Sequence, residues 1–329
     1  MTNHAIIAQP AAGFTEADLE MPVPLPFDLI VRVEAVSLNP VDLKRHENLK
    51  SPTVLGYDAV GIIRAAGARV TNFKVGERVF YAGTTQRPGS NQAYQAIDAR
   101  LVAKAPEGFD VSEIAALPLV SLTAWELLFE KMRFIPEAGA NADKTLLVIN
   151  GAGGVGSVLT QLAAWSGLTV LATASPKNHA WLTDHSVTTP IDYHQDLIEA
   201  VHNAGHETLD GIAILYNPEA YTSAAGELIK PFGHVGTIVG PGPEIDLAAI
   251  KNKAASLDFE YMFAKSDSHY QIETQGEILT QISTLVSKLK LTSPVTKVFE
   301  GLTIDNMAAA AQLQASGHQV GKIVITLPH

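Results

Sequence analysis

The stretch KTLLVINGAGGVG, residues 144–156, decides the fold of this chain. Its apolar run at 146–149 predicts a buried strand, and the segment from residue 155 onward has the apolar spacing of a helix. Between them, residues 151–156 fit the pattern G-x-G-x-x-G. Glycine permits positive φ and close approach of a ligand to the backbone, and the free N–H groups at a helix start suit a pyrophosphate. The stretch therefore predicts a strand–turn–helix unit that binds a dinucleotide.

Strand and helix patterns alternate downstream of this unit. Helices are expected at 155–165 and 218–230, and the candidate strands are residues 146–150, 169–174, 209–215, 234–239 and 257–262. Alternation of this kind predicts a parallel sheet with helices on both faces. The fold class is therefore α/β, with a doubly wound Rossmann domain.

The segment before about residue 122 is predicted to be β-rich. Residues 31–36 alternate apolar and polar, as a half-buried strand does, and residues 60–63 and 77–81 read as further short strands between turn formers. Residues 122–129 then predict a helix. After about residue 266, helices are expected at 272–289 and 305–315, with strands at 295–299 and 322–327. We expect this last segment to return to the β-rich domain.

Composition and charge limit the classes of partner. The 329 residues suffice for two domains, and 47% hydrophobic with 17% charged residues is typical of a globular protein. A net charge of −11 argues against nucleic acid. No apolar run approaches the ~18 residues that span a bilayer, and the first residues lack a signal peptide. The absence of cysteine excludes disulfides and thiolate ligands. We therefore expect a cytoplasmic protein without membrane or nucleic-acid partners.

The end of the second strand of the dinucleotide unit indicates the cofactor. In NAD-binding units an Asp or Glu about 20 residues past the glycines binds the ribose 2′-hydroxyl. Here residues 169–174 lead into Ser175 and Lys177, and no carboxylate is present. A hydroxyl donor and a cation suit a 2′-phosphate, so the sequence favours NADPH over NADH. Tyr193 is a candidate neighbour of the adenosine phosphate. The alternative for Lys177 is a solvated residue in the first turn of a helix.

Several motifs together carry a resemblance to a known family. Besides the glycine turn they are SLNPVD (37–42), LGYD (55–58), VFYAG (79–83), RPGSN (87–91), ALPL (116–119), LTAWE (122–126) and GKIV (321–324). With these motifs the chain resembles the medium-chain dehydrogenase/reductase superfamily over essentially its whole length. It is most similar to the zinc-independent quinone oxidoreductase branch, in a subgroup often labelled zinc-type alcohol dehydrogenase-like.

The resemblance implies a domain organisation. A GroES-like catalytic domain would comprise residues 1–121 and 267–329, and a Rossmann NADPH-binding domain would comprise residues 122–266. Pairing between Rossmann domains would give a homodimer, through the strands near Val239 and Phe259.

The resemblance also assigns residues to the cofactor. Thr123 would lie near the nicotinamide ribose, although it also suits a helix start, and Lys322 of the GKIV motif would contact the cofactor. The residues of the turn expected at the phosphates are Gly151, Gly153, Gly154 and Val155.

The positions that hold catalytic zinc in metal-dependent relatives carry other residues here. The first ligand position is Asn39 and the position of the histidine is Tyr57. Neither supplies the thiolate or imidazole that zinc favours, so we expect no metal. A site without a Lewis acid favours acceptors that spread negative charge themselves, such as quinones and α,β-unsaturated carbonyls. Asn39 and Tyr57, with Tyr81 as a third candidate, would donate hydrogen bonds to the substrate oxygen.

Each of these residues also has an ordinary structural explanation. Asn39 precedes Pro40 and suits a turn. Tyr57 suits a buried aromatic with a satisfied hydroxyl, and Phe263, which could wall the substrate side, suits the core.

The sequence thus predicts an NADPH-dependent, metal-free reductase of quinones or enones. Two alternatives remain. One is a reductase of simple carbonyls or an alcohol dehydrogenase with an unusual site, and the other is an NADPH-binding redox sensor with little turnover.

Overall fold

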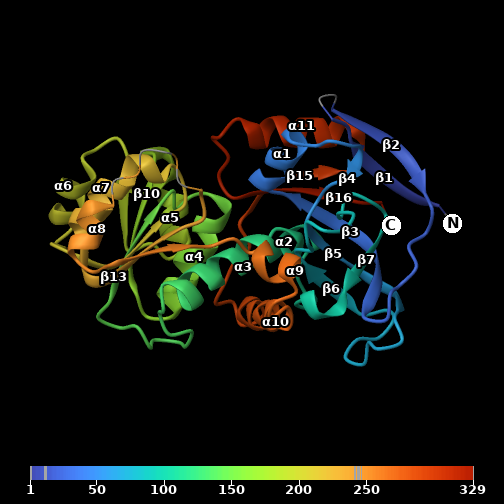
Figure 1. Ribbon diagram of the computed structural model, residues 1–329, viewed down its shortest axis with the longest axis horizontal. Coiled ribbons are helices and arrows are strands. Elements are labelled where there is room, and N and C mark those ends of the chain that lie inside the picture. The colour runs from blue at the N-terminus through green and yellow to red at the C-terminus, as the bar shows by residue number, and fades with distance from the viewer. Residues whose placement is uncertain (1, 11–12, 241, 243–244, 246, 329) are drawn as a thin grey trace. The chain divides into compact units, whose positions relative to one another are not determined.

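The chain forms two compact units in the computed structural model shown in Figure 1, which describes residues 2–10, 13–240, 242, 245 and 247–328. One unit comprises Met1–Leu122, Met262–Leu289 and Ser293–His329, and the other comprises Thr123–Tyr261 and Lys290–Thr292. Among the described residues, no helix is both long enough and apolar enough to span a bilayer.

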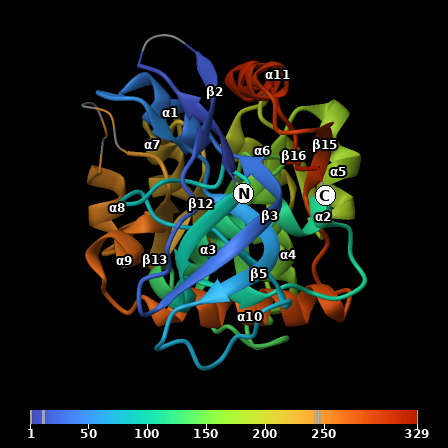
Figure 2. The same cartoon turned by 90° about the vertical axis from the view of Figure 1, so that its right-hand side faces the viewer.

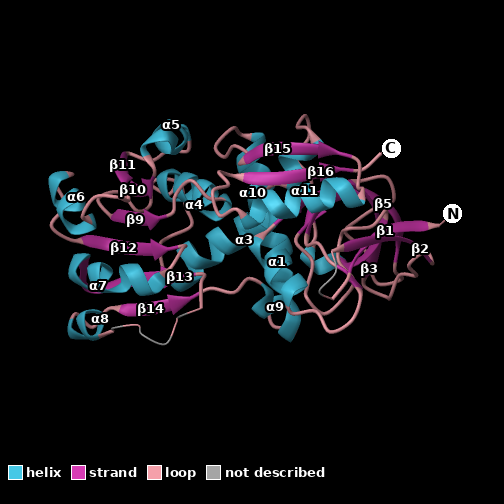
Figure 3. Cartoon of the chain, turned by 90° about the horizontal axis from the view of Figure 1, so that it is seen from above, coloured by secondary structure: helices cyan, strands magenta, loops and turns pink. Residues whose placement is uncertain are grey.

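The unit formed mainly by residues 123–261 contains a six-stranded parallel sheet (Figure 3). In sequence order the strands are β9 (Thr145–Ile149), β10 (Thr169–Ala174), β11 (Thr189–Asp192), β12 (Leu209–Ile214), β13 (Ile229–Thr237) and β14 (Ser256–Phe259). In space they follow the order β11-β10-β9-β12-β13-β14. Strands β10 and β11 are added on one side of β9, and β12, β13 and β14 on its other side. This strand order is the doubly wound arrangement, and it confirms the predicted fold class.

Helices cover both sides of this sheet (Figure 1). They are α4 (Gly154–Trp165), α5 (His179–Asp184), α6 (Leu197–Asn203), α7 (Pro218–Leu228) and α8 (Ala248–Asn252). Helix α4 packs on β9 and β10, whereas α7 packs on β12 and β13 and contacts α6 and α8. The strands are buried on both faces, which explains why they read as nearly continuous apolar runs.

The largest differences from the predicted boundaries in this unit lie at β13 and β14. Strand β13 begins at Ile229 rather than at residue 234, so helix α7 ends at Leu228, and β14 ends at Phe259 rather than at 262. For β13 the cause is an irregularity in the β12–β13 ladder, where Leu209 pairs with Ile229 but Gly211 pairs with His234. The extra residues of β13 include Phe232 at a φ of 61°. A bulge of this kind breaks the pattern of period two on which the prediction rested.

The helix predicted at 122–129 is observed as α3 (Pro118–Trp125) followed by a π-helical turn at Glu126–Lys131. This turn contacts β13 and β14. It buries Glu126, which forms a hydrogen bond with the buried Glu260. Burial and the neighbouring Glu126 together raise the pKa of Glu260 to about 9. Two carboxyl groups can share a hydrogen bond only if one is protonated, so this pair retains a proton at neutral pH.

The other unit is β-rich, as predicted. Its strands are β1 (Asn3–Ala8), β2 (Phe14–Leu19), β3 (Asp28–Leu38), β4 (Thr53–Val54), β5 (Asp58–Ala66), β6 (Arg78–Tyr81), β7 (Tyr94–Asp98), β8 (Ala103–Lys104), β15 (Val295–Glu300) and β16 (Lys322–Thr326). One sheet has the order β2-β1-β4, and the other has the order β15-β16-β3-β5-β6-β8, with β7 paired to β3. The C-terminal segment therefore joins the first residues of the chain in one sheet, because β16 pairs antiparallel with β3.

Helices border these sheets. They are α1 (Pro40–Glu47), α2 (Val111–Ala115), α9 (Phe263–Ser268), α10 (Glu273–Ser287) and α11 (Ile304–Ala315). Helix α11 packs on β16, β15 and β2, and it also contacts α1 (Figure 2). The apolar side chains of β3, β5, β16 and α11 form one buried core.

Candidate functional site

The glycine turn joins β9 to α4 with its backbone held against β10. The N–H of Asn150 donates to Thr173 Oγ1 at 2.9 Å, and the N–H of Gly151 donates to Thr173 O at 3.0 Å. Gly153 is the N-cap of α4 and carries no capping side chain. The first N–H groups of a helix have no partner within it. Those of Gly154 and Val155, both half-buried, are therefore positioned to bind an anion.

The glycines of this turn are required by close packing rather than by positive φ. None of the four has a positive φ, and the left-handed residue of the turn is Asn150, with a φ of 66°. A Cβ at Gly156 would lie 2.5 Å from Asn150 O, and one at Gly151 would lie 2.7 Å from Ala172 Cβ. These two glycines let helix and strand touch. At Gly153 a Cβ would meet only Asn150, with Nδ2 at 3.2 Å as its nearest atom.

The end of β10 carries the residues predicted at the 2′-phosphate. Ser175 is half-buried, and Lys177 is exposed in a 3-10 turn at Pro176–Asn178. Within the described part of the chain, the Lys177 ammonium forms no hydrogen bond or ion pair. The parallel register pairs Ala174 with Asp192, which places Tyr193 beside this strand end. The structure therefore brings Ser175, Lys177 and Tyr193 to neighbouring strand ends of one sheet, with Thr123 buried elsewhere in the same unit.

A carboxylate does lie near this strand end, on Asp192, the last residue of the neighbouring strand β11. Asp192 Oδ1 accepts from the N–H of His194 and lies 2.6 Å from Nδ1 of the same residue. The hydrogen bond from the His194 backbone lowers the pKa of Asp192, and the His194 and His179 side chains act in the same direction. The ring of Tyr193 lies 4.1 Å from that of His194 and is half-exposed.

The β-rich unit holds a buried polar cluster around Asn39. Asn39 is 1% exposed, Asp58 is 0% and Lys322 is 3% exposed. Asn39 Nδ2 donates to Asp58 Oδ2 at 2.9 Å and to Ser37 O at 3.3 Å. Lys322 Nζ donates to Asn39 Oδ1 at 2.5 Å and to Asp58 Oδ2 at 2.9 Å. Asp58 Oδ1 in turn accepts from the N–H of Leu119 at 2.6 Å.

This cluster changes what Asn39 and Lys322 are expected to do. An amide has two N–H donors, and both of those of Asn39 are engaged within the protein. Asn39 therefore has no spare donor for a substrate oxygen in this arrangement. It is also the N-cap of α1, with Pro40 at the first helical position and a capping box with Asp42.

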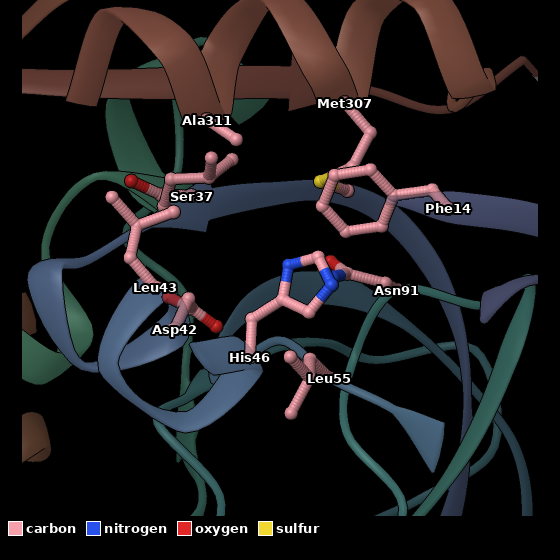
Figure 4. A pocket seen from close by; sticks show the side chains of 10 residues that line it. Phe14, Ser37, Asp42, Leu43, His46, Leu55, Asn91, Met307 and Ala311 are labelled. Atoms are coloured by element: carbon pink, nitrogen blue, oxygen red, sulfur yellow. The ribbon is translucent and has the colours of Figure 1, made fainter. Parts of the chain in front are cut away.

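Asp42 lies on the other side of Asn39, at a small cavity. Its Oδ2 accepts from the N–H of Asn39 at 2.8 Å, and its Oδ1 is buried without a hydrogen bond of normal geometry among the described residues. The cavity measures about 10 Å³, enough for one water molecule, and is lined by α1, α11 and Phe14 (Figure 4). Burial raises the pKa of Asp42 to about 7, against the opposing effects of the Asn39 N–H and Lys322. Asp42 thus changes its charge near neutral pH.

The two predicted tyrosines lie in the same unit and are both buried. The ring of Tyr57 packs against that of Phe263 at a centroid distance of 4.7 Å. Tyr81 donates its hydroxyl to Gln95 Oε1 at 2.9 Å, and burial raises its pKa. The Tyr81 hydroxyl therefore uses its proton in a hydrogen bond within the protein. The ring of Tyr57 forms an aromatic pair with Phe263.

Two known families match the chain. Residues 26–107 match the alcohol dehydrogenase GroES-like domain, and residues 185–325 match the family described as zinc-binding dehydrogenase. The chain is 37% identical over 318 residues to a zinc-type alcohol dehydrogenase-like protein of Staphylococcus epidermidis, with 95% of each chain covered. The chain belongs to the medium-chain dehydrogenase/reductase superfamily.

This medium-chain dehydrogenase/reductase is also similar to a solved structure and to a plant relative. It superposes on a putative zinc-dependent alcohol dehydrogenase from Rhizobium etli with a TM-score of 0.93 and 33% identity, covering 100% and 99% of the two chains. It is 27% identical over 329 residues to an NADPH-dependent alkenal/one oxidoreductase of Arabidopsis thaliana, covering 94% of this chain and 75% of the relative. The protein is an oxidoreductase of this superfamily, whose members use a nicotinamide cofactor and small-molecule substrates.

The word zinc in these names does not fit the residues of this medium-chain dehydrogenase/reductase. Asn39, at the position of the first zinc ligand in metal-dependent relatives, and the neighbouring Asp58 both accept from the Lys322 ammonium through Oδ1 and Oδ2, and this ammonium would repel a second cation. In the described ranges of the chain, no three His, Cys, Asp or Glu side chains form a group that could hold a metal ion. We therefore derive no catalytic step through zinc.

Sequence reasoning missed several residues that the structure places at these sites. Asp58 directly follows Tyr57 in the motif LGYD, and its partner Lys322 is 264 residues away. Glu126 ends the motif LTAWE, and Glu260 stands in an apolar segment at the end of β14. An acid among apolar residues signals a buried group that needs a partner, but the sequence gives no means to pair the two.

Proposed function

We propose that the protein is an NADPH-dependent, metal-free reductase that transfers hydride to quinones or α,β-unsaturated carbonyls. The observation that carries the proposal is that the Lys322 ammonium donates to Asn39 Oδ1, at the position of the first zinc ligand in metal-dependent relatives, and to the neighbouring Asp58 Oδ2. A Lewis acid stabilises the alkoxide formed from a simple carbonyl. Substrates that delocalise the charge themselves suit a site without one. Similarity to the alkenal/one oxidoreductase supports the same substrate class.

The choice of NADPH rests on the end of β10. The exposed Lys177 ammonium and the Ser175 hydroxyl suit a 2′-phosphate, and neither Ser175 nor the two residues after it is acidic. The N–H groups of Gly154 and Val155 would bind the pyrophosphate. In this proposal Thr123 stands near the nicotinamide ribose and Tyr193 near the adenosine.

Bound NADPH would supply a hydride from C4 of its nicotinamide ring. As hydride adds to the β-carbon of an enone, the electron pair of the double bond moves onto the carbonyl oxygen. In this proposal Tyr57, which the family resemblance of the motif LGYD places at the substrate, donates a hydrogen bond to that oxygen. The α-carbon then takes a proton from solvent.

A steady-state comparison of a quinone, an enone and a simple alcohol tests the proposal. We expect NADPH-dependent turnover of the quinone or the enone and none of the alcohol. Turnover of the alcohol alone, with bound zinc found by elemental analysis, would contradict it. Tight NADPH binding without hydride transfer to any acceptor would instead identify a redox sensor.

Removal of one hydroxyl tests the role of Tyr57. In Tyr57→Phe we expect kcat to fall on the order of 100-fold, because the substrate oxygen loses its donor at the moment its charge develops. The Kd of NADPH, measured by fluorescence titration, should not change. The control is Tyr270→Phe, which removes an exposed hydroxyl from the same unit. Equal rates in wild type and Tyr57→Phe would leave Tyr57 as a packing residue only.

We also propose a homodimer formed through β14. This strand is at the end of the sheet order, and Phe259 and Tyr261 beside it are exposed. Light scattering should give twice the mass of one chain, and Tyr261→Asp should reduce it. A single-chain mass for the wild type at assay concentration would refute this pairing.

A further inference from the structure

The Lys322 ammonium is enclosed by three oxygen atoms of the β-rich unit. Its Nζ lies 2.6 Å from Leu38 O, 2.5 Å from Asn39 Oδ1 and 2.9 Å from Asp58 Oδ2. An ammonium has three N–H donors, and these three oxygens account for all of them. Lys322 is also 3% exposed. It therefore has neither a free donor nor a free surface with which to reach a cofactor phosphate.

Sheet register brings this cluster together. Strand β16 pairs antiparallel with β3 so that Ile323 faces Leu38, and β3 pairs with β5 so that Ser37 faces Asp58. Lys322, Asn39 and Asp58 thus stand at the same end of three adjacent strands. The hydrogen-bond ladders between these strands fix the backbone positions of the three residues, so their side chains start from a rigid frame.

The hydrogen bonds fix the orientation of the Asn39 amide. Its Oδ1 accepts from the ammonium, and its Nδ2 donates to Asp58 and to Ser37 O. A flipped amide would turn its N–H donors toward the ammonium and its oxygen toward a carboxylate. Both contacts would be repulsive, and the repulsion is strong because the three side chains are buried, so one orientation is favoured.

We propose that Lys322 acts as a tethered cation in place of a metal, and that it positions the Asn39 amide and the Asp58 carboxylate instead of binding the cofactor. This inference rests on the proposed function only for its kinetic readout. The ammonium neutralises the Asp58 charge, as a metal ion would, but it is part of the chain. It leaves no free oxygen with which the cluster can take up zinc.

The role differs from that of a cofactor ligand in a measurable way. A residue that binds NADPH affects the Kd of NADPH, whereas a residue that positions the reacting groups affects kcat. A buried charge pair also cannot lose one partner without cost, because Asp58 would remain buried and unpaired. The single variant Lys322→Met is therefore compared with the double variant Lys322→Met/Asp58→Asn. The double variant removes both charges and leaves no buried, unpaired carboxylate.

The experiment measures NADPH affinity by fluorescence, kcat with the active acceptor, zinc content after dialysis against zinc, and the side-chain amide resonances of Asn39. In the double variant we expect an unchanged Kd of NADPH, a kcat reduced on the order of 100-fold, and shifted Asn39 resonances. Lys322→Arg should recover part of kcat. The control Lys265→Met removes another buried ammonium of the same unit and should retain wild-type kcat. The wild type should retain no stoichiometric zinc.

Three results would overturn the inference. The first is a double variant that binds NADPH more weakly but keeps the wild-type kcat. The second is one zinc ion per wild-type chain, with a shift of the Asn39 resonances. The third is that the Asn39 resonances do not change when Lys322 is removed. If neither substituted chain folds, zinc titration of the wild type followed at the Asn39 resonances still decides the matter. If the wild type reduces no acceptor, the proposed function fails, while affinity, zinc content and resonances still test Lys322.

Discussion

In Lys177→Ala we expect the Kd of NADPH to rise about 10–100-fold while the Kd of NADH changes little. A hydrogen bond to a charged group contributes about 1.5–3 kcal/mol, and each 1.4 kcal/mol is about tenfold in affinity. Lys177 is exposed just past β10, and its ammonium has no protein partner among the described residues. No existing ion pair must therefore break before it binds a phosphate. NADH lacks the 2′-phosphate, so its affinity does not depend on a contact with Lys177.

Fluorescence titration with both cofactors, at two salt concentrations, measures this preference. The matched control is Lys251→Ala, which removes the same charge from the exposed face of α8. The Lys177 effect on NADPH should shrink as salt increases, because an exposed phosphate contact is screened. Equal losses for NADPH and NADH, or equal effects of the two lysines, would show that Lys177 is a solvated residue of its turn.

The glycine turn could be predicted from the sequence because its determinants are local. The strand, the turn and the start of α4 lie within residues 144–156. The nearest neighbour of each of Gly151, Gly153 and Gly156 is close in sequence or on the adjacent strand. Strand β11 was not predicted, since its four residues include Pro190 and lack an alternating pattern. It is a strand because the register with β10 pairs it there. Pairing with β10 determines that these residues form a strand, and a short sequence pattern carries no information about that pairing.

The polar cluster was predictable only in part. The motifs SLNPVD and LGYD identified Asn39 and Tyr57, but the state of the Asn39 amide depends on Lys322, which is 283 residues distant. Sequence reasoning placed Asn39 and Lys322 in separate roles, at the substrate and at the cofactor. The sheet order β16-β3-β5 joins them in one hydrogen-bonded group. A short motif identifies a candidate residue. The hydrogen-bond partners of that residue, once buried, depend on which strands are neighbours in the sheet.

In Glu260→Gln we expect the thermal stability of the protein to become less dependent on pH between about 5 and 9. Burial and the neighbouring Glu126 raise the pKa of Glu260 from 4.5 to about 9 in the folded chain. Below pH 4.5 the proton is bound in both folded and unfolded chains, so the contribution of the pair is fully present. Between the two values the folded chain keeps the proton that the unfolded chain releases. The free energy of unfolding then falls by up to about 1.4 kcal/mol per pH unit, and the contribution is lost as the pH rises through 9.

Glutamine at residue 260 keeps the size of the side chain and supplies an N–H donor to Glu126 without a titrating proton. The variant should therefore gain most at alkaline pH, with a melting temperature raised by about 2–4 °C for each kcal/mol recovered. Glu137→Gln, which removes an exposed carboxyl from the same unit, should keep the wild-type pH dependence. Glu126→Gln provides the reciprocal test, because its amide would donate to an ionised Glu260 and remove the like charge that raises its pKa. If both glutamine variants melt as the wild type does at pH 6 and at pH 9, then the carboxyls do not share a proton.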